Sequence, residues 1–294
     1  MTQSRWWLPN LGSFWILVAT LGFAIMGAFV KVGAEKFTSS ELVFYRSAFG
    51  LIFISLYIAK QKLPLKTPVL AKHMTRSLVG FFALLLFFYA IAHLPLASAI
   101  TLNYTSPLFL AAMMPFMLKD EHHSNQNKRL LYAALLIGFI GVVLLLQPTF
   151  RSQDILAGSL GLLSGAGAGL AYIHVKKLGQ ANEPDWRTVF YFTLVCTVGA
   201  GIWMLANHFS PLALRDLPTL MGLGISATIA QLALTRAYRT GNTLIVASLA
   251  YTTVIFASMI GYFYWQEALS PNEIFAISLI IFGGMLSVFS TRNN

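Results

Sequence analysis

The chain alternates between long apolar runs and short polar connections. Ten runs of roughly 18–23 residues can be marked along its sequence. They begin near Ser13, Glu41, Met74, Ala97, Leu130, Ile155, Thr188, Leu217, Thr243 and Pro271. Because an α-helix rises about 1.5 Å per residue, each run is long enough to cross about 30 Å of hydrocarbon. The pattern predicts an all-α integral membrane protein with ten transmembrane helices.

The second five runs repeat the spacing of the first five. Their starts are offset from those of the first five by 142, 147, 143, 146 and 141 residues, close to half of the 294-residue chain. Because five is an odd number, the second copy of a five-helix unit must cross the membrane in the opposite direction to the first. Inverted repeats of this kind are common in secondary transporters. We therefore expect two inverted five-helix repeats, residues 13–147 and 155–290, in one membrane domain.

The overall composition fits a membrane protein. Hydrophobic residues make up 57% of the chain and charged residues 10%, which is more apolar surface than a soluble protein of this size could bury. The first run lacks a short apolar core followed by a small-residue cleavage site, so we expect residues 13–32 to be a spanning helix and not a secretory signal. The single cysteine, Cys196, is expected to be a buried thiol.

The basic residues fall mostly on one side of the predicted membrane. That side receives fifteen Lys and Arg residues, Arg76 among them, the other side receives four, and Arg46 lies inside a run. Short loops rich in Lys and Arg stay in the cytoplasm, so we expect both termini there, with membrane lipid as the partner of this charge. The net charge of +10 does not indicate nucleic-acid binding, because the chain has no basic domain or arm.

Two runs carry features that suit close helix packing or a binding site. Gly161, Gly165 and Gly169 recur every four residues, so they share one helix face that a neighbouring backbone can approach. Such a face also suits a surface on which one bundle moves against another. Pro107 lies well inside the fourth run and removes a backbone hydrogen bond there, so we expect a kink near Asn103 and Tyr104.

The ninth run is the counterpart of the fourth. Tyr251 stands 147 residues after Tyr104, and Val254 takes the place of Pro107, so we expect this helix to be straighter. The two tyrosines are the preferred binding pair, because a polar tip on an aromatic body suits a partly wet site. The alternative is a packed tyrosine with one hydrogen bond.

Few other polar residues lie deep in the runs. Arg46 attracts an anionic group of a substrate, holds the second helix in place through a carbonyl or a tyrosine, or snorkels outward. No Asp or Glu lies deep in any run. A buried carboxylate or a histidine relay is typical of proton-coupled carriers, so we expect exchange, facilitated diffusion or transport driven by the charge of the substrate. The run 120–123, Asp-Glu-His-His, is expected to be a solvated loop and not a metal site.

The order, spacing and duplication of these motifs resemble the drug/metabolite transporter superfamily, and within it the EamA-type carriers with ten helices. The resemblance covers nearly the whole chain and is carried by FYAIAHLPLASAITLNYTSPLFLAAMM and LTRAYRTGNTLIVASLAYTTVIFASMIGYFYWQEALS. It implies a basket-like bundle with a central cavity and alternating access. One departure is Met26-Gly27, where family members often carry Trp-Gly. With Arg46 added, the expected substrate-binding residues are Tyr104, Tyr251, Asn103, Gln231, Tyr89, Tyr172 and Arg46.

These inferences together predict a secondary transporter that moves a small organic metabolite, similar to an amino acid, a nucleoside or S-adenosylmethionine, across a bacterial inner membrane. The sequence leaves the oligomeric state open. The alternative is a membrane-embedded scaffold or receptor without transport activity, which would favour longer soluble loops. An enzyme is not expected, because no acid, base or metal ligands converge within the runs, and no cofactor is expected.

Overall fold

The computed structural model describes residues 11–94, 96–118, 128–146, 155–207, 209–266 and 270–289. These residues form helices joined by short connections, without a β-strand among them. The helices are α1 (Leu11–Gly33), α2 (Ser39–Gln61), α3 (Leu70–His93), α4 (Leu96–Asn103), α5 (Ser106–Met117), α7 (Lys128–Leu146), α8 (Ile155–Gln180), α9 (Asp185–Ala206), η2 (Leu214–Asp216), α10 (Leu217–Thr240), α11 (Thr243–Leu249), α12 (Thr252–Trp265) and α13 (Pro271–Phe289).

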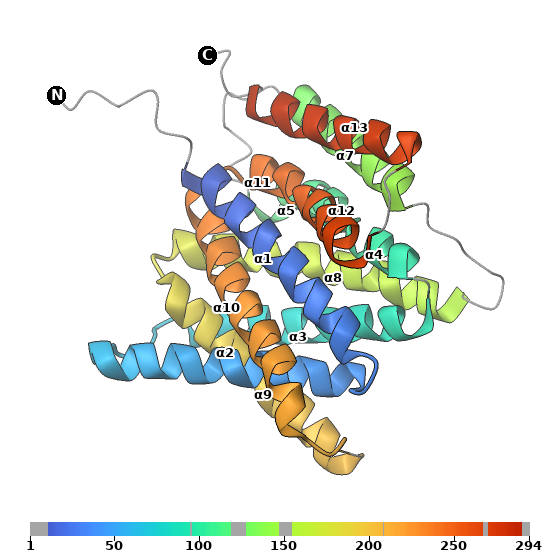
Figure 1. The fold of residues 1–294 in the computed structure, drawn as a ribbon. Coiled ribbons are helices and arrows are strands. Elements are labelled where there is room, and N and C mark those ends of the chain that lie inside the picture. Colours follow the sequence, from blue (N-terminus) through green and yellow to red (C-terminus); the bar gives the residue numbers. More distant parts are fainter. Residues whose placement is uncertain are drawn as a thin grey trace.

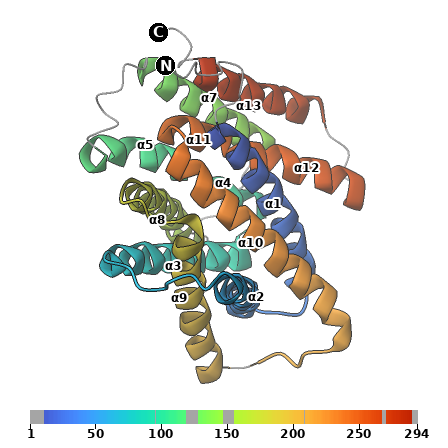
Figure 2. The same cartoon turned by 90° about the vertical axis from the view of Figure 1, so that its left-hand side faces the viewer.

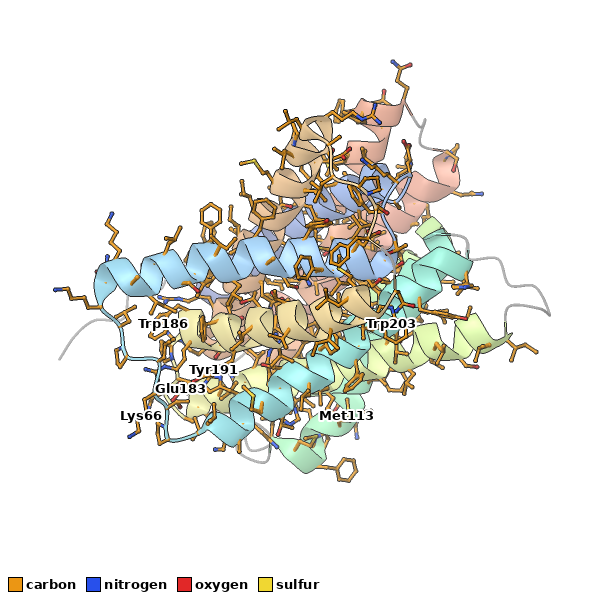
Figure 3. The ribbon with its side chains drawn as sticks, turned by 90° about the horizontal axis from the view of Figure 1, so that it is seen from below. Lys66, Met113, Glu183, Trp186, Tyr191 and Trp203 are labelled. Carbon is orange, nitrogen blue, oxygen red and sulfur yellow. The ribbon has the colours of Figure 1, made fainter. Side chains whose placement is uncertain are left out.

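Seven stretches of the described chain are long and apolar enough to cross a membrane. They are Gly12–Gly33, Ser39–Gln61, Leu70–Ala90, Ile155–Gln180, Asp185–Ala206, Leu214–Thr240 and Thr243–Tyr264. Arg129–Leu144 and Ile274–Leu286 are shorter apolar helices. Trp186 and Trp203 lie near opposite ends of α9 (Figure 3), where aromatic residues of spanning helices meet the membrane surfaces. The all-helical class predicted from the sequence is confirmed.

The helices pack in pairs that bring together distant parts of the chain. α1 lies along α10, α3 along α8, α2 along α9, and α7 along α13 at one edge of the bundle (Figures 1 and 2). One buried apolar cluster gathers side chains mainly from α1, α5, α7, α8 and α10–α13, and a second gathers them mainly from α1, α2, α3, α9 and α10. Large apolar side chains also remain exposed, such as those of Leu56, Ile202 and Phe263. Exposed apolar surface of this extent is typical of a bundle surrounded by lipid.

The glycine face of α8 packs against the junction between α4 and α5. A Cβ atom added to Gly165 would meet the Thr105 hydroxyl and lie 2.6 Å from the carbonyl oxygen of Leu102. One added to Gly169 would lie 2.7 Å from the carbonyl oxygen of Ser106. The helix packing predicted for this face is confirmed, because only a residue without a side chain lets the two backbones come so close.

Both the fourth and the ninth predicted helices are broken at equivalent places. α4 ends one residue before Tyr104, and α11 ends at Leu249, two residues before Tyr251. The kink expected near Tyr104 is confirmed, whereas the expectation of a straighter ninth helix is wrong. Both breaks share a threonine. Thr105 Oγ1 donates to the carbonyl oxygen of Leu102 (2.5 Å), and Thr252 Oγ1 donates to that of Leu249 (2.8 Å). Such bonds often accompany a bend, although the equivalent bond of Thr20 lies within the unbroken α1.

The close approach at Gly165 gives a testable prediction. Gly165→Ala places a methyl group against backbone atoms that cannot rotate away, and overpacking of this kind costs about 1–3 kcal/mol. We expect a melting temperature several degrees below that of the wild type, measured by intrinsic fluorescence on purified protein in detergent. Gly158→Ala, on the same helix, is the matched control because nothing lies within 4 Å of its added Cβ. Equal melting temperatures for the two variants would contradict the packing described.

Candidate functional site

A small polar cavity lies between α2, α9 and α10. It is lined by Arg46, Ser47, Phe192, Thr193, Ala227, Thr228 and Gln231. Its volume of about 10 Å³ gives room for a single water molecule. Two of the predicted site residues, Arg46 and Gln231, therefore lie together at one place. The Nε2 atom of Gln231 is buried without a hydrogen-bond partner among the described residues.

A second buried arginine lies beside this cavity. The guanidinium carbon of Arg76 lies 3.9 Å from the centre of the Phe192 ring, and that of Arg46 lies 6.0 Å from the same ring centre. Arg46 is 5% exposed and Arg76 is 2% exposed. Both cations therefore meet the face of one aromatic ring, in the arrangement of a cation–π contact. We call Arg46, Arg76 and Phe192 the arginine centre.

Arg76 was counted with the basic residues of the cytoplasmic side, and the structure places it buried within α3. The third apolar run was marked from Met74, but α3 begins at Leu70, so that Arg76 lies one and a half turns inside the helix. Pro68, two residues before α3, is the signal in the sequence that could have indicated this earlier start. Gly80 makes room for the arginine, since its added Cβ would lie 3.1 Å from Nη1 of Arg76 and 3.0 Å from the Phe192 ring.

Tyr172 and Cys196 complete the surroundings of the arginine centre. Each of them interacts electrostatically with both guanidinium groups. Cys196 is fully buried and also hydrogen-bonds to the side chain of Ser47. Tyr172 stacks on Tyr238 with ring centroids 5.0 Å apart and an interplanar angle of 17°. The tyrosine therefore connects the arginine centre to the place where α8 meets α10.

The predicted tyrosine pair is brought together next to this region. The ring centroids of Tyr104 and Tyr251 are 6.4 Å apart. Tyr104 hydrogen-bonds to the side chain of Thr253 and interacts electrostatically with Tyr172. Tyr251 is fully buried against Phe139 and Gly138, and its hydroxyl has no partner among the described residues. A buried hydroxyl without a partner is costly, so this ring is available to a ligand or a water molecule.

Two predicted site residues lie apart from both groups. Asn103 donates from its side-chain nitrogen to the hydroxyl of Ser164 (3.2 Å) at the glycine face of α8. Tyr89 stacks on His93, with ring centroids 4.0 Å apart, near the C-terminal end of α3. The structure thus places Arg46, Gln231 and Tyr172 around the arginine centre and Tyr104 with Tyr251 beside it.

A second hollow, of about 370 Å³, lies between α3 and α9. Its lining is apolar, and Leu78, Phe82 and Val198 are exposed there. Without a polar group to orient a solute, this groove fits the lipid-facing surface better than a substrate site.

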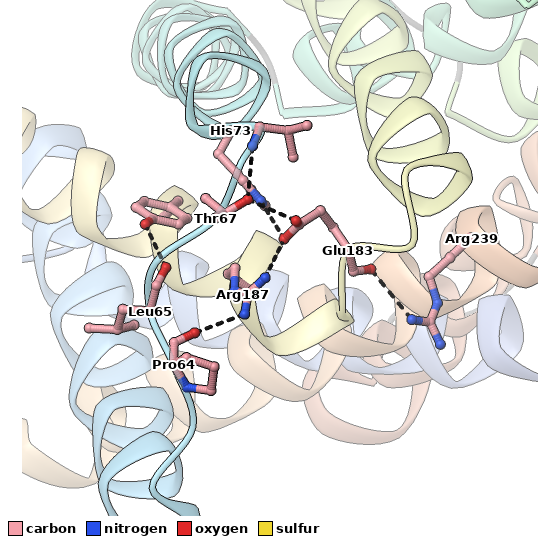
Figure 4. A network of polar contacts seen from close by, with 9 residues as sticks. Pro64, Leu65, Thr67, His73, Glu183, Arg187 and Arg239 are labelled. Atoms are coloured by element: carbon pink, nitrogen blue, oxygen red, sulfur yellow. Dashed lines mark hydrogen bonds and ion pairs between the residues drawn. The ribbon is translucent and has the colours of Figure 1, made fainter.

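A polar network binds the loops at one end of α9 (Figures 3 and 4). The Glu183 carboxylate accepts hydrogen bonds from Thr67 (2.7 Å), His73 (3.0 Å) and Arg187 (2.9 Å). Arg239 of α10 donates to the carbonyl oxygen of Glu183 (3.4 Å). Burial raises the pKa of Glu183, but these hydrogen bonds and the nearby Arg187 charge together hold its pKa below the usual value of 4.5. Sequence reasoning did not find this residue.

A comparable network binds the loops at the other end of the bundle. Ser210 donates to the Glu41 carboxylate through its backbone N–H (2.5 Å) and its hydroxyl (3.1 Å). Lys36 forms an ion pair with Asp216. The two networks therefore fix the loops around α2 and α9 at both ends of the bundle.

Metal binding has no support in the described part of the chain. No group of three metal-ligating side chains occurs among those residues. The acidic and histidine run at 120–123 lies outside the described residues.

The Glu183 network gives a second prediction. Glu183→Gln removes the negative charge to which Arg187 and His73 are hydrogen-bonded. A hydrogen bond to a charged group contributes about 1.5–3 kcal/mol to the free energy of unfolding. We expect the variant to melt at a lower temperature than the wild type at pH 7. Because the pKa of Glu183 is lowered in the folded state, this difference should be complete above about pH 4.5 and should shrink as the pH falls further. A difference that is the same at pH 7 and at pH 3.5 would contradict it.

Comparison with known proteins places the chain in a family. The profile of the EamA-like transporter family matches residues 10–147 and, a second time, residues 155–289. The pseudopaline exporter of Pseudomonas aeruginosa is 30% identical over 281 residues, covering 96% of this chain and 94% of the exporter. The S-adenosylmethionine uptake transporter of Rickettsia bellii is 21% identical, covering 96% and 95%, and the riboflavin transporter of Vibrio cholerae is 27% identical, covering 78% and 76%.

A solved crystal structure shares the fold. It superposes with a TM-score of 0.83 at 16% sequence identity, covering 96% of this chain and 99% of the other. The fold, the packing of the helices and the two profile matches agree with one another. The chain belongs to the EamA-like transporter family.

Proposed function

We propose that this protein is a secondary carrier that moves a small organic metabolite across a bacterial cytoplasmic membrane by alternating access. Ten spanning segments in two inverted repeats, residues 13–147 and 155–290, provide the two halves that move. In this assignment α1, α2, α3, α4 with α5, and α7 correspond to α8, α9, α10, α11 with α12, and α13. The observation that carries the proposal is the helix packing: when each helix is replaced by its counterpart, most packed pairs become packed pairs again. The largest departure lies at one end of the bundle.

Most helix pairs have the counterpart that the exchange requires. The pair α1–α10 becomes α8–α3, the pair α1–α12 becomes α8–α5, and the pair α2–α10 becomes α9–α3; all six pack closely. The pairs α2–α9 and α7–α13 map onto themselves and also pack closely. The breaks at Tyr104 and Tyr251 correspond as well. This regularity supports two repeats related by a two-fold axis.

The most extensive exception is the pair α8–α10. Its counterpart, α1–α3, does not pack closely within the described residues of those two helices. The smaller contacts α7–α11 and α5–α11 also lack closely packed counterparts, α13–α4 and α12–α4, among the described residues. The α8–α10 contact lies near the C-terminal ends of both helices, where Tyr172 stacks on Tyr238 and Lys176 Nζ donates to the carbonyl oxygen of Gly241 (2.8 Å). We call this contact the α8–α10 seam. It closes one end of the bundle, and the end formed by α1 and α3 lacks such a closure.

Two glycines at corresponding positions of α8 and α1 also differ in how closely they are packed. Gly169 of α8 packs against the backbone of α5, whereas nothing lies within 4 Å of a Cβ added to Gly27 of α1, 142 residues earlier. Gly27 is exposed although buried residues such as Ile16 and Thr20 occupy the same side of α1. This difference supports a path from the α1–α3 end toward the middle of the bundle.

The charge distribution supports an orientation for this path. The α8–α10 seam lies beside Lys176, Lys177 and the other residues of the Lys- and Arg-rich side, which the positive-inside rule places in the cytoplasm, together with both termini. In this orientation the bundle is closed toward the cytoplasm and open toward the outside. Moving Arg76 out of the loop count leaves fourteen basic residues against four, so the assignment is unaffected.

The relatives support the kind of cargo. Their names specify pseudopaline, S-adenosylmethionine and riboflavin, which are small organic metabolites. The arginine centre and the tyrosine pair offer hydrogen-bond donors and aromatic faces in an apolar bundle, as binding sites for such solutes do. No observation favours a scaffold or a receptor over a carrier.

Transport by purified protein tests the proposal. We expect protein reconstituted in liposomes to accumulate at least one compound from a bacterial metabolite extract, identified by mass spectrometry against empty liposomes. Tyr104→Ala and Tyr251→Ala remove the tyrosine pair and should each lower the initial rate at least tenfold, because each deletes one wall of the site. Tyr57→Ala, at an exposed position of α2, should transport normally. Normal rates in both pair variants would show that these rings only pack the bundle.

A further inference from the structure

The arginine centre contains more hydrogen-bond donors than acceptors. The Nε and Nη1 atoms of Arg46 and of Arg76, and the Nε2 atom of Gln231, are buried without a hydrogen-bond partner among the described residues. These five N–H-bearing atoms come from α2, α3 and α10 and lie around Phe192 of α9. Guanidinium groups have no acceptor atom, so they cannot satisfy one another. An acceptor group has to come from elsewhere.

The described carboxylates do not supply it. Glu41, Glu183, Asp185 and Asp216 are bound by other groups at the two ends of the bundle, and Glu35 is exposed between α1 and α2. Arg46 repels Arg76, and the uncharged Cys196 and Tyr172 also act on it. His73 and His174 interact with Arg76 too, and neither supplies a negative charge. Two like charges thus share one apolar site without a counter-charge in the described protein. Such an arrangement is costly in a membrane and marks a functional position.

The geometry points to a carboxylate of the substrate as the missing partner. We propose that Arg46 and Arg76 form the binding site for a carboxylate group of the transported metabolite, with Gln231 as a further donor and the Phe192 ring as the wall. This inference rests on the proposed function and adds the chemical class of the cargo. A planar carboxylate fits the forked donors of an arginine, and one negative charge reduces the repulsion between the two cations.

The cavity volume fits the same interpretation. Room for a single water molecule means that α2, α9 and α10 must separate slightly when a carboxylate enters beside Arg46. The carrier would thus respond to its substrate by a change in helix packing, because the anion favours the arrangement in which the two guanidinium groups can both reach it. A neutral solute would not favour the separated arrangement of α2, α9 and α10 over the closely packed one in this way.

A structural role is the other explanation for the two arginines. In that case the cation–π contact with Phe192 holds both side chains, and neither recognises charge on a solute. The two explanations differ in one measurable property. A binding role makes transport selective for a carboxylate over the carboxamide of the same shape, whereas a structural role does not.

The first experiment asks which compounds the wild type accumulates. Liposomes of phosphatidylcholine are used, so that no anionic lipid headgroup competes, and the bacterial metabolite extract is the probe. We expect every compound that accumulates to carry a carboxylate. Accumulation of compounds without a carboxylate would overturn the inference and leave the proposed function intact. Accumulation of nothing above empty liposomes would contradict the proposed function itself and the inference with it.

The second experiment tests the arginines with the compound so identified. Arg46→Gln and Arg76→Gln should each raise KM at least tenfold, and Arg46→Lys and Arg76→Lys should recover part of the loss because they keep the charge without the fork. Arg215→Gln, at an exposed position between α9 and α10, is the matched control and should behave as the wild type. Unchanged KM values in both glutamine variants would overturn the inference.

The third experiment does not depend on whether the variants fold. The carboxamide analogue of the same compound competes with its uptake by the wild type. We expect the analogue to compete at least tenfold more weakly than the carboxylate itself. Equal competition by acid and amide in the wild type would show that the arginines have a structural role.

Discussion

The burial of two arginines against one phenylalanine ring is the constraint on which the centre of this bundle depends. A charged side chain within a spanning helix is costly, up to about 2.5–3.5 kcal/mol at the helix centre on insertion scales. Arg46 and Arg76 are nevertheless buried. Gly80 allows this, because a side chain at that position would contact both Arg76 and Phe192. α2, α3, α9 and α10 are arranged around the two arginines.

The arginine centre is connected to the α8–α10 seam. Tyr172 interacts electrostatically with both guanidinium groups and stacks on Tyr238 in the α8–α10 seam. The helix of Tyr172, α8, also carries the glycine face against which the α4–α5 junction packs. Tyr172 therefore contacts both the arginine centre and the α8–α10 seam. In the mechanism that we propose, this residue would link the binding site to the closure, as alternating access requires.

The sequence predicted the parts of the structure that depend on local composition. Apolar runs gave the helices, and the glycine spacing gave the α8 packing face, because both follow from one helix at a time. The break before Tyr251 was missed because the kink at Tyr104 was attributed to Pro107, and the ninth run has Val254 in its place. What the two breaks share is a Tyr-Thr pair whose threonine bonds to a carbonyl three residues earlier.

The arginine centre could be predicted only in part. Arg46 stood out because it lies inside an apolar run, but Arg76 lies near the start of α3 and looked like a loop residue. Its meeting with Phe192, 116 residues later, depends on how α3 packs against α9, and no local pattern reports that. The same holds for Glu183, whose partners come from the loop before α3 and from α9. Long-range contacts between charged groups were the part that required the structure.

The central claim is that the arginine centre is reached alternately from the two sides of the membrane. The only cysteine, Cys196, lies beside both arginines and serves as its native reporter. The most direct measurement is the modification of Cys196 by a membrane-impermeant, anionic methanethiosulfonate reagent, applied separately to right-side-out and inside-out vesicles. The account predicts modification from both sides, faster from the outside in the absence of substrate. Modification from one side alone, or from neither, would contradict it.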